Sequence, residues 1–564
     1  MKILAIHDGH NASVCLLDNG EIIYASQEER YTNVKNQGGL PIRCLEFIDI
    51  TFDLNSIDEI IFVGNSMTTS DWTRTSILHS YKNSDTILNT IKQKIKNNTM
   101  IYSLYQSKKN IRNKYPEVYF HAKTMEHHLC HASTAYFGLG NYDDEILVIT
   151  ADGDGDLKSA TASIGYKGNL EEIMSMPTKD SLGRLYSYIT YLYNMVPYEH
   201  EYKIMGLAPY CNDKEKIQEC KLKLKKIIDF SDDNSLQWKY LGKYPSIQNA
   251  GKEIKDIFYN TRFDVMAAAI QEFVEEIVVE WITRLIGHTG IKKVALAGGL
   301  FMNVKANMLI SEIKELEDIF IFPSCGDESN VFGAVWHRYF QKTKSYPKRL
   351  EHFYFGTEIE IVEEELLQEA KINHWIVQKK DNIEKEIASL LAQGEIVGRV
   401  KGSMEFGARS LGNRAILANP SIDGIVKTIN EMIKGRDFWM PFAPSLLEED
   451  LEKYFQVNSK VLDYDYMIFT AYSHPNIRKY AKNALHPYDF TGRPQAVKKN
   501  QNSDYYNLLQ YYKDITGESL ILNTSYNLHG LPMVANMEQA LYVFQNSKLK
   551  FLALNNYLIK KNNV

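Results

Sequence analysis

EILVITADGDGDLKSATASIG, at residues 145–165, is the stretch that decides the fold of this chain. Its apolar residues 145–151 predict a buried strand, and SATASIG at 159–165 predicts a second strand. Between them, DGDGD at 152–156 predicts a tight turn, in which glycines let backbone N–H groups approach phosphate oxygens. The stretch therefore has the pattern of a strand–turn–strand unit that can hold a phosphate group.

A similar unit opens the chain. KILAI at 2–6 predicts a short apolar strand, and SVCLL at 13–17 predicts a second one after a turn-like segment. A hairpin turn at 18–20 then leads into EIIYAS at 21–26. Two such units in one region predict a duplicated nucleotide-binding fold of the α/β class.

A third unit carries a Gly-Gly turn. Residues 265–286 predict a buried or amphipathic helix rather than a membrane span, because glutamates interrupt the apolar residues. The strand KKVALA at 292–297 follows and leads into Gly298 and Gly299, with a helix expected from about Asn303. Ligands of open α/β sheets bind at the carboxyl ends of strands, so this turn is a candidate binding site.

Composition and charge limit the class of protein. The chain has 564 residues, of which 44% are hydrophobic and 24% charged, as in soluble globular proteins of several domains. A net charge of −6 provides no global basic field, which argues against a nucleic-acid partner. Six cysteines without a CxxC pair argue against a disulfide framework or a zinc ribbon. With no signal-peptide pattern, we expect a cytoplasmic protein without a membrane partner.

A polar, basic stretch with one proline, QKTKSYPKRLE at 341–351, predicts a linker. We therefore expect two domains, at residues 1–345 and 352–564. The second contains a basic, glycine-containing stretch at 398–414 and a proline-rich one at 440–445, followed by an α/β pattern.

Two histidines and two aspartates form a candidate metal site. His127 and His131 are four residues apart, so on a helix their imidazoles share one face. Asp152 and Asp327 each follow an apolar strand. A lone HxxxH is more often a pair of surface histidines, but with these carboxylates it suits iron, manganese or zinc.

Several other polar residues are candidates for binding. Guanidinium and ammonium groups of the second domain stand among Gly, Phe, Leu and Pro rather than among other charges, which favours binding of a polyanion over a solvated face. They are Arg409, Arg414, Lys434, Arg436 and Arg493. Asn523, Ser525 and Asn527 follow an apolar run and could hold phosphate or ribose oxygens, or form an ordinary polar turn. His10, in a turn near the start, could act as a general base or be an ordinary turn residue.

The chain resembles the NodU/CmcH-type O-carbamoyltransferases, a family that decorates antibiotics and nodulation factors. Ten segments carry the resemblance, in family order and over nearly the whole chain: HNASVCLL, EERYTNVK, HHLCHASTAYFG, KIMGLAPY, LAGGLFMNVKAN, GDESN with a later GAV, MEFGARSLGNRAIL, IKGRDFWMPFAPS, TGRPQAV and LNTSYN.

The resemblance implies a first domain similar to the TsaD-type member of the actin-like, sugar-kinase and Hsp70 ATPase (ASKHA) superfamily. It implies a second domain similar to YrdC. The KxR signature of YrdC-type proteins matches Lys434 and Arg436, and their SxN signature matches Ser525 and Asn527.

The resemblance also implies a reaction in two steps, with ATP, carbamoyl phosphate and Mg²⁺. In the YrdC-like pocket, carbamoyl phosphate would lose its phosphate, and the resulting carbamate would attack the α-phosphate of ATP to give carbamoyl adenylate and pyrophosphate. Lys434, Arg436 and Arg493 would neutralise the phosphate charge. In the first domain, a hydroxyl of a small-molecule acceptor, a natural product or a sugar, would then displace AMP.

Further roles follow from the resemblance. Iron(II) or another divalent metal would bind His127, His131, Asp152 and Asp327. His10 would act as base or orienter, and Lys35 would contact the carbamoyl adenylate. Gly298, Gly299 and Asn303 would lie near the adenosine. A homodimer is a possible assembly.

The chain departs from the family pattern at a few positions. Ser403 and Met440 stand where many relatives have arginine, and Ala408 stands where proline is common. Tyr202 and Cys211 replace frequent glycines. Fewer arginines would weaken the binding of carbamoyl phosphate, and Tyr202 would reshape the acceptor cleft.

Three alternatives stay open beside this interpretation. Threonylcarbamoyladenosine synthesis on tRNA would require a basic RNA surface. Carbamoylation of a thiol in hydrogenase maturation would require an acylphosphatase domain and paired-cysteine zinc modules. A non-catalytic ATP-binding scaffold would have lost the metal or KxR positions, which are intact here.

Overall fold

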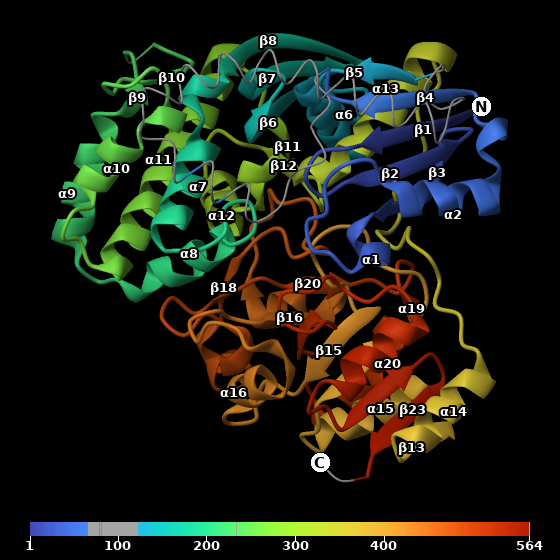
Figure 1. The fold of residues 1–564 in the computed structure, drawn as a ribbon. Coiled ribbons are helices and arrows are strands. Elements are labelled where there is room, and N and C mark those ends of the chain that lie inside the picture. The colour runs from blue at the N-terminus through green and yellow to red at the C-terminus, as the bar shows by residue number, and fades with distance from the viewer. Residues whose placement is uncertain (66–77, 79–80, 82–121, 233, 563–564) are drawn as a thin grey trace. The chain divides into compact units, whose positions relative to one another are not determined.

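The computed structural model describes residues 1–65, 78, 81, 122–232 and 234–562 (Figure 1). Contacts within the chain divide it into two compact units. Unit 1 comprises Met1–Glu28, Asn36–Arg349 and Lys460–Leu462, and unit 2 comprises Glu29–Lys35, Leu350–Ser459 and Asp463–Val564. The change from unit 1 to unit 2 at Arg349 falls inside the stretch predicted as a linker.

Unit 1 contains two five-stranded sheets with the same strand order. The first has the order β3-β2-β1-β4-β5, and the second has the order β8-β7-β6-β11-β12. The strands of the first sheet are β1 (Lys2–His7), β2 (Ser13–Asp18), β3 (Glu21–Gln27), β4 (Glu59–Val63) and β5 (Ala122–Met125). Those of the second are β6 (Ile146–Gly155), β7 (Lys158–Tyr166), β8 (Asn169–Pro177), β11 (Lys293–Ala297) and β12 (Asp318–Ile321).

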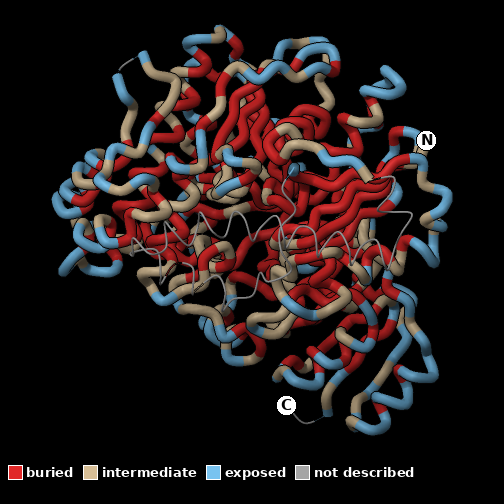
Figure 2. The backbone as a smooth tube through the Cα atoms, turned by 45° about the horizontal axis from the view of Figure 1, so that its top comes forward, coloured by how far each residue is buried: buried red, intermediate tan, exposed pale blue. Residues whose placement is uncertain are grey.

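The pairing pattern repeats as well. In each sheet three antiparallel strands are followed by two parallel ones. This topology confirms the predicted duplicated core of the ASKHA type, because the second sheet has the same strand order and the same pairing directions as the first. In Figure 2 most strands of the two sheets are buried, whereas β5 and β8, the last strands at one edge of each sheet, are largely exposed or half-buried.

Two buried helices connect the sheets. Helix α6 (His127–Leu139) packs on β6 and β11, helix α13 (Asn330–Thr343) packs on β1 and β2, and the two helices pack against each other. Every residue of α6 except Leu129 is buried. The other helices in the described part of unit 1 are α2 (Ile42–Phe52), α7 (Leu182–Leu192), α8 (Glu201–Leu207), α9 (Lys214–Lys225), α10 (Gly251–Ile257), α11 (Phe263–Thr289) and α12 (Val304–Ser311). A small ribbon pairs β9 (Ile228–Phe230) with β10 (Trp238–Tyr240).

The long helix expected at 265–286 is α11, which ends at the left-handed Gly290. Its apolar side chains face the other helices of unit 1, and its glutamates interrupt the hydrophobic surface. Among the described residues, no helix combines the length and apolar character needed to span a bilayer.

The turn expected at 152–156 lies further along the chain. Strand β6 continues to Gly155, which pairs with Lys158, and the turn is formed by Asp156 and Leu157. A register shift between Ala151 and Gly155 lets the strand pass its two glycines and stay paired. The correction matters for the site, because it places Asp152 within the strand rather than at its end.

Unit 2 is built on an eight-stranded mixed sheet with the order β13-β23-β22-β14-β15-β21-β16-β20. Its strands are β13 (Trp375–Lys379), β14 (Val397–Val400), β15 (Arg414–Ala418), β16 (Ala443–Leu447), β20 (Gln495–Val497), β21 (Ile521–Ser525), β22 (Phe551–Leu554) and β23 (Tyr557–Lys561). A smaller sheet contains β17 (Phe455–Gln456), β18 (Ala471–Ser473) and β19 (Thr491–Gly492). The helices in the described part of unit 2 are α1 (Glu29–Thr32), α14 (Glu363–Ile372), α15 (Ile383–Ala392), α16 (Ile425–Ile429), α17 (Leu451–Tyr454), α18 (Arg478–Ala481), α19 (Ser503–Thr516) and α20 (Met537–Gln545).

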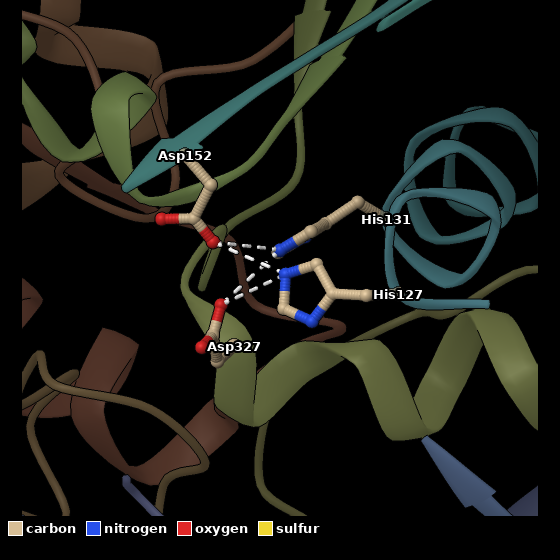
Figure 3. Close-up of side chains that lie close together, drawn as sticks. All are labelled: His127, His131, Asp152 and Asp327. Atoms are coloured by element: carbon tan, nitrogen blue, oxygen red, sulfur yellow. Dashed lines mark hydrogen bonds and ion pairs between the residues drawn. The ribbon is translucent and has the colours of Figure 1, made fainter. Parts of the chain in front are cut away.

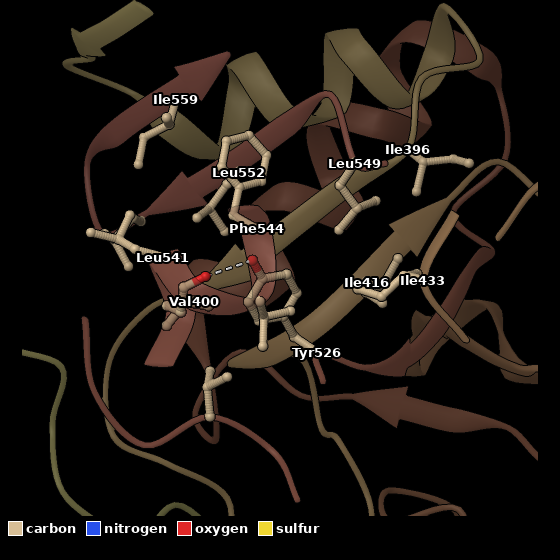
Figure 4. Close-up of a cluster of buried hydrophobic side chains, with 14 of the residues drawn as sticks. Ile396, Val400, Ile416, Ile433, Tyr526, Leu541, Phe544, Leu549, Leu552 and Ile559 are labelled. Atoms are coloured by element: carbon tan, nitrogen blue, oxygen red, sulfur yellow. Dashed lines mark hydrogen bonds between the residues drawn. The ribbon is translucent and has the colours of Figure 1, made fainter. Parts of the chain in front are cut away.

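The large sheet is covered on both faces. Alternate residues of β15 point to opposite sides, since Ile416 belongs to the core under α14, α16 and α20, and Leu417 to the core under α15 and α19. Figure 4 shows the first of these cores, in which the Tyr526 hydroxyl donates to the Ala540 carbonyl at 3.0 Å. The YrdC-like assignment of unit 2 stays a prediction.

We expect Gly298→Ala to destabilise unit 1. Gly298 has φ +109°, and an added Cβ would lie 2.2 Å from the carbonyl oxygen of Ala151. The strained backbone and the clash together predict a loss of about 2 kcal/mol or more in the free energy of unfolding. The measurement is thermal and denaturant unfolding of wild type and variant.

Gly287→Ala is the matched control. Gly287 lies in α11, where nothing lies within 4 Å of an added Cβ, so this change should stabilise the helix by about 0.5 to 1 kcal/mol. Equal stability of Gly298→Ala and wild type would show that the turn is not constrained as described.

Candidate functional site

Four side chains converge in unit 1 (Figure 3). Two come from α6: His127 Nε2 lies 3.3 Å from Asp152 Oδ2 and 3.4 Å from Asp327 Oδ1, and His131 Nε2 lies 3.2 and 3.3 Å from the same two atoms. Asp152 is on β6, and Asp327 begins the short turn that precedes α13. Segments up to 200 residues apart in sequence thus meet at one point because the repeated sheets bring them together.

The donor set fits one divalent cation. One ligand atom from each of the four residues lies within 4.8 Å of the others. Ligands about 2.1 Å from an ion at tetrahedral angles are about 3.4 Å apart, which matches the four contacts. Two imidazoles and two carboxylates are the donor types that iron, manganese and zinc accept.

The carboxylates of this cluster favour a positive charge beside them. Burial lowers the pKa of His127, but Asp327 and Asp152 overcome burial and raise it to about 9. Burial raises the pKa of Asp152, yet hydrogen bonds with His127 and His131 hold it well below its usual range. The buried carboxylate is therefore ionised and is stabilised by the positive charge of a protonated imidazole or of a cation.

His10 borders this cluster. Its Nε2 lies 3.3 Å from Asp327 Oδ2, and its ring stacks on Tyr198 with 5.4 Å between ring centroids. Tyr198 has φ +66°, a strained conformation for a tyrosine, and the Arg184 guanidinium lies 5.2 Å from the centre of its ring. Arg184 in turn pairs with Asp154 at 2.6 Å. Sequence reasoning missed Tyr198 and Arg184, because neither belongs to a recognisable local pattern.

The Gly-Gly turn lies beside Asp152. A Cβ on Gly299 would lie 2.9 Å from Asp152 Oδ1, so a larger residue would displace the carboxylate. Asn303 caps α12 by accepting from the Ala306 N–H at 3.2 Å, and its side chain exchanges hydrogen bonds with Gln271. The contacts predicted between these three residues and adenosine stay predictions.

In unit 2, Lys434 of the KxR signature is joined by hydrogen bonds to Ser525 and Asn527 of the SxN signature. Lys434 ends a π-helical turn (Asn430–Lys434), and its Nζ donates to Asn527 Oδ1 at 2.6 Å and to Ser525 Oγ at 3.1 Å. The Ser525 hydroxyl also donates to Asn527 Oδ1, at 2.7 Å. The sheet position of β21 and the irregular helix therefore fix the ammonium group in place.

Five cations of unit 2 act on one another. Burial, and then Arg436 and Lys35, hold the pKa of Lys434 well below its usual range. Burial, and then Arg409 and Arg436, do the same for Arg493. Lys35 belongs to the segment Glu29–Lys35 that packs with unit 2. A bound anion would relieve this repulsion, so the cluster is a candidate polyanion site.

Arg414 and Asn523 make their hydrogen bonds within the protein, and the binding roles predicted for them stay predictions. Arg414 is fully buried, and its guanidinium donates to backbone carbonyls, among them those of Lys401, Gly402 and Val534. Asn523 is also buried, and its amide donates to three neighbouring oxygens, those of the Ser410 carbonyl, the Ser445 hydroxyl and the Gln495 side chain. Both side chains therefore hold loops and strands together, and their donors are used within the protein.

The fold and the two clusters define an α/β protein of the ASKHA type with a candidate metal centre in unit 1 and a candidate polyanion site in unit 2. The family model described as Carbamoyltransferase N-terminus matches residues 2–336, and the one described as Carbamoyltransferase C-terminus matches residues 388–561. The chain therefore belongs to the carbamoyltransferase family and is an enzyme that transfers carbamoyl groups.

Similar proteins span nearly the whole chain. An uncharacterized protein of Methanocaldococcus jannaschii is 32% identical to this chain, over 99% of this chain and 99% of the length of the relative. Nodulation protein NolNO of Sinorhizobium fredii is 29% identical, over 98% of this chain and 79% of its own, and nodulation protein NolO of Bradyrhizobium diazoefficiens is 29% identical over 78% and 79%. Among solved structures, that of HypF of T. kodakarensis matches over 60% of this chain and 48% of the HypF chain, with 12% identity and a TM-score of 0.34.

We expect the purified protein to bind about one divalent ion per chain and His131→Ala to bind it at least about 100-fold more weakly, because loss of a ligand costs more than loss of an outer partner. Elemental analysis after dialysis and titration with Fe²⁺, Mn²⁺ and Zn²⁺ measure this. His288→Ala, which changes an exposed histidine at the end of α11, is the control. Unchanged binding in His131→Ala would exclude the four residues as the metal centre.

Proposed function

We propose that this enzyme is an ATP-dependent O-carbamoyltransferase that makes carbamoyl adenylate in unit 2 and passes the carbamoyl group to a small-molecule hydroxyl in unit 1. The observation that carries the proposal is the cluster of five basic side chains that includes Lys434, whose ammonium group is held in place by the hydrogen bonds that it donates to Ser525 and Asn527. Such a density of basic side chains, of which Lys434 is buried and the other four are half-buried, suits the phosphates of ATP and carbamoyl phosphate.

The first step forms the adenylate. Water cleaves carbamoyl phosphate into inorganic phosphate and carbamate, and a carbamate oxygen then bonds to the α-phosphorus of ATP while the bond to the β-phosphate oxygen breaks. Pyrophosphate leaves, with Mg²⁺ as its counter-ion. Lys434, Arg436 and Arg493 would neutralise charge on the oxygens that gain it, which is supported by their mutual electrostatic interaction in one cluster.

The second step transfers the group. The acceptor hydroxyl oxygen bonds to the carbamoyl carbon, the bond from that carbon to the AMP oxygen breaks, and the hydroxyl proton passes to a base. His10, with its Nε2 3.3 Å from Asp327, is the base or orienter that the geometry favours. A divalent ion such as iron(II), held by His127, His131, Asp152 and Asp327, would supply Lewis-acid polarisation of the carbamoyl oxygen.

The acceptor is proposed to be a natural product or a sugar. The acidic net charge of −6 disfavours tRNA as the acceptor. A non-catalytic scaffold is disfavoured because the four donor residues converge and the KxR and SxN residues remain connected. With Ser403 and Met440 in place of the frequent arginines, the cluster still contains five basic side chains, among them Lys434 and Arg493.

We expect wild-type protein with carbamoyl phosphate, ATP and Mg²⁺, and no acceptor, to form pyrophosphate and carbamoyl adenylate. Lys434→Ala should lower the rate at least about 100-fold, because one charged donor to a transferring phosphoryl group contributes about 3 kcal/mol. Mass spectrometry of the adenylate and a pyrophosphate assay measure both products.

Two variants serve as controls. Lys427→Ala removes an exposed lysine of α16 and should leave the rate unchanged. His131→Ala should still form the adenylate, because its site belongs to unit 1. If wild type forms neither product, the adenylate mechanism is wrong and the tRNA and scaffold alternatives return.

A further inference from the structure

Asp156, which lies outside the metal donor set, binds the first residue of the ligand helix. Its Oδ2 accepts a hydrogen bond from the backbone N–H of His127 at 2.8 Å. Both of its carboxylate oxygens also accept from the backbone N–H of Asn65, at 3.0 and 2.8 Å. One side chain therefore connects the end of β4, the start of α6 and the turn after β6.

The contact is directed at the ligand residue itself. The first N–H groups of a helix have no partner within the helix, and side chains usually satisfy them. Here Glu126 caps α6 by accepting from the Leu129 N–H at 2.6 Å. Asp156 satisfies the N–H of His127, so the backbone of a candidate metal ligand is fixed independently of the ordinary cap.

Strand β6 and the turn that follows it contact His127 at three points. Asp152 lies 3.3 Å from the imidazole Nε2, and an added Cβ on Gly155 would lie 2.1 Å from the imidazole Cδ2. Asp156 holds the backbone N–H. The segment 152–156 therefore contacts the imidazole at Nε2 and at Cδ2 and holds the backbone of His127, which leaves the ring little freedom to turn.

The turn geometry allows this arrangement. Asp156 has φ +49°, a left-handed conformation that aspartate, asparagine and glycine adopt more readily than other residues. The next residue, Leu157, is also left-handed at φ +71° and is 85% exposed. The turn directs the carboxylate back toward α6 and leaves Leu157 in solvent.

We propose that Asp156 is a positioning residue of the metal centre, which sets the metal affinity by holding His127 in its ligating orientation. The inference rests on the proposed metal site in unit 1. Partners of metal ligands typically change the metal affinity by about 10- to 100-fold when they are removed. The effect acts through the backbone of His127, whereas partners of ligand histidines usually act on the second ring nitrogen.

Asp156→Gly and Asp156→Asn test the role, because both residues tolerate the left-handed turn. Glycine removes the acceptor, and we expect it to weaken binding of Mn²⁺ to metal-stripped full-length protein by about 10- to 100-fold. Asparagine keeps an oxygen acceptor for the His127 N–H, so it should restore affinity to within a few-fold of wild type. Titration followed by electron paramagnetic resonance gives the dissociation constants.

Leu157→Gly is the matched control, since it changes the other left-handed residue of the same turn. Its Mn²⁺ affinity should equal that of wild type. If Leu157→Gly weakens binding as much as Asp156→Gly, or if Asp156→Gly binds like wild type, the positioning role is overturned while the metal site stands. If wild type binds no divalent ion, the metal site itself fails, and the inference fails with it.

Discussion

The close packing of α6 against α13 is the constraint on which the site in unit 1 depends. An added Cβ on Gly333 would lie 2.0 Å from the Cys130 carbonyl oxygen, so the two helices approach as nearly as their backbones allow. Thr134 fastens the contact, because its hydroxyl donates to the carbonyls of Cys130 and Ser329 and accepts from the Gly333 N–H at 3.1 Å. Asp327 lies just before α13, so this packing brings it to the histidines of α6. Without that approach, the carboxylate would be too far from the imidazoles to share a cation with them.

Each unit gathers charged side chains of one kind in buried or half-buried positions. Unit 1 places Asp152 and Asp327 against imidazoles, and unit 2 gathers five basic side chains, among them Lys434 and Arg493. Removing a charge from water without a full partner costs several kcal/mol, which folding alone would select against. Such clusters are therefore candidates for binding ligands of opposite charge, which is the basis for the metal ion proposed in unit 1 and the phosphates proposed in unit 2.

The sequence predicted the elements better than it predicted their ends and partners. Alternating apolar strands and glycine turns identified the repeated sheets, because strand periodicity is a local property. The turn at Asp156 was misplaced, since only pairing across β6 and β7 keeps glycines such as Gly155 in a strand. Arg414 has the same sequence environment as a phosphate-binding arginine, and its burial depends on carbonyls far away in the chain, such as that of Val534. Likewise, no local sequence pattern indicates that Glu29–Lys35 belongs to unit 2 while the residues on either side of it belong to unit 1.

The opposite charges of the two clusters give a physical reason for a reaction in two steps. Release of pyrophosphate needs cations at the phosphate oxygens, whereas activation of a hydroxyl needs a base and acidic ligands that hold a metal. In one pocket, the lysine and arginines would pair with the carboxylates, and each set would neutralise the other. Separate clusters keep both sets available, and the proposed adenylate would provide a large group by which the second site could hold the carbamoyl carbon. The arrangement of charge on this chain thus favours an activated intermediate over direct transfer from carbamoyl phosphate.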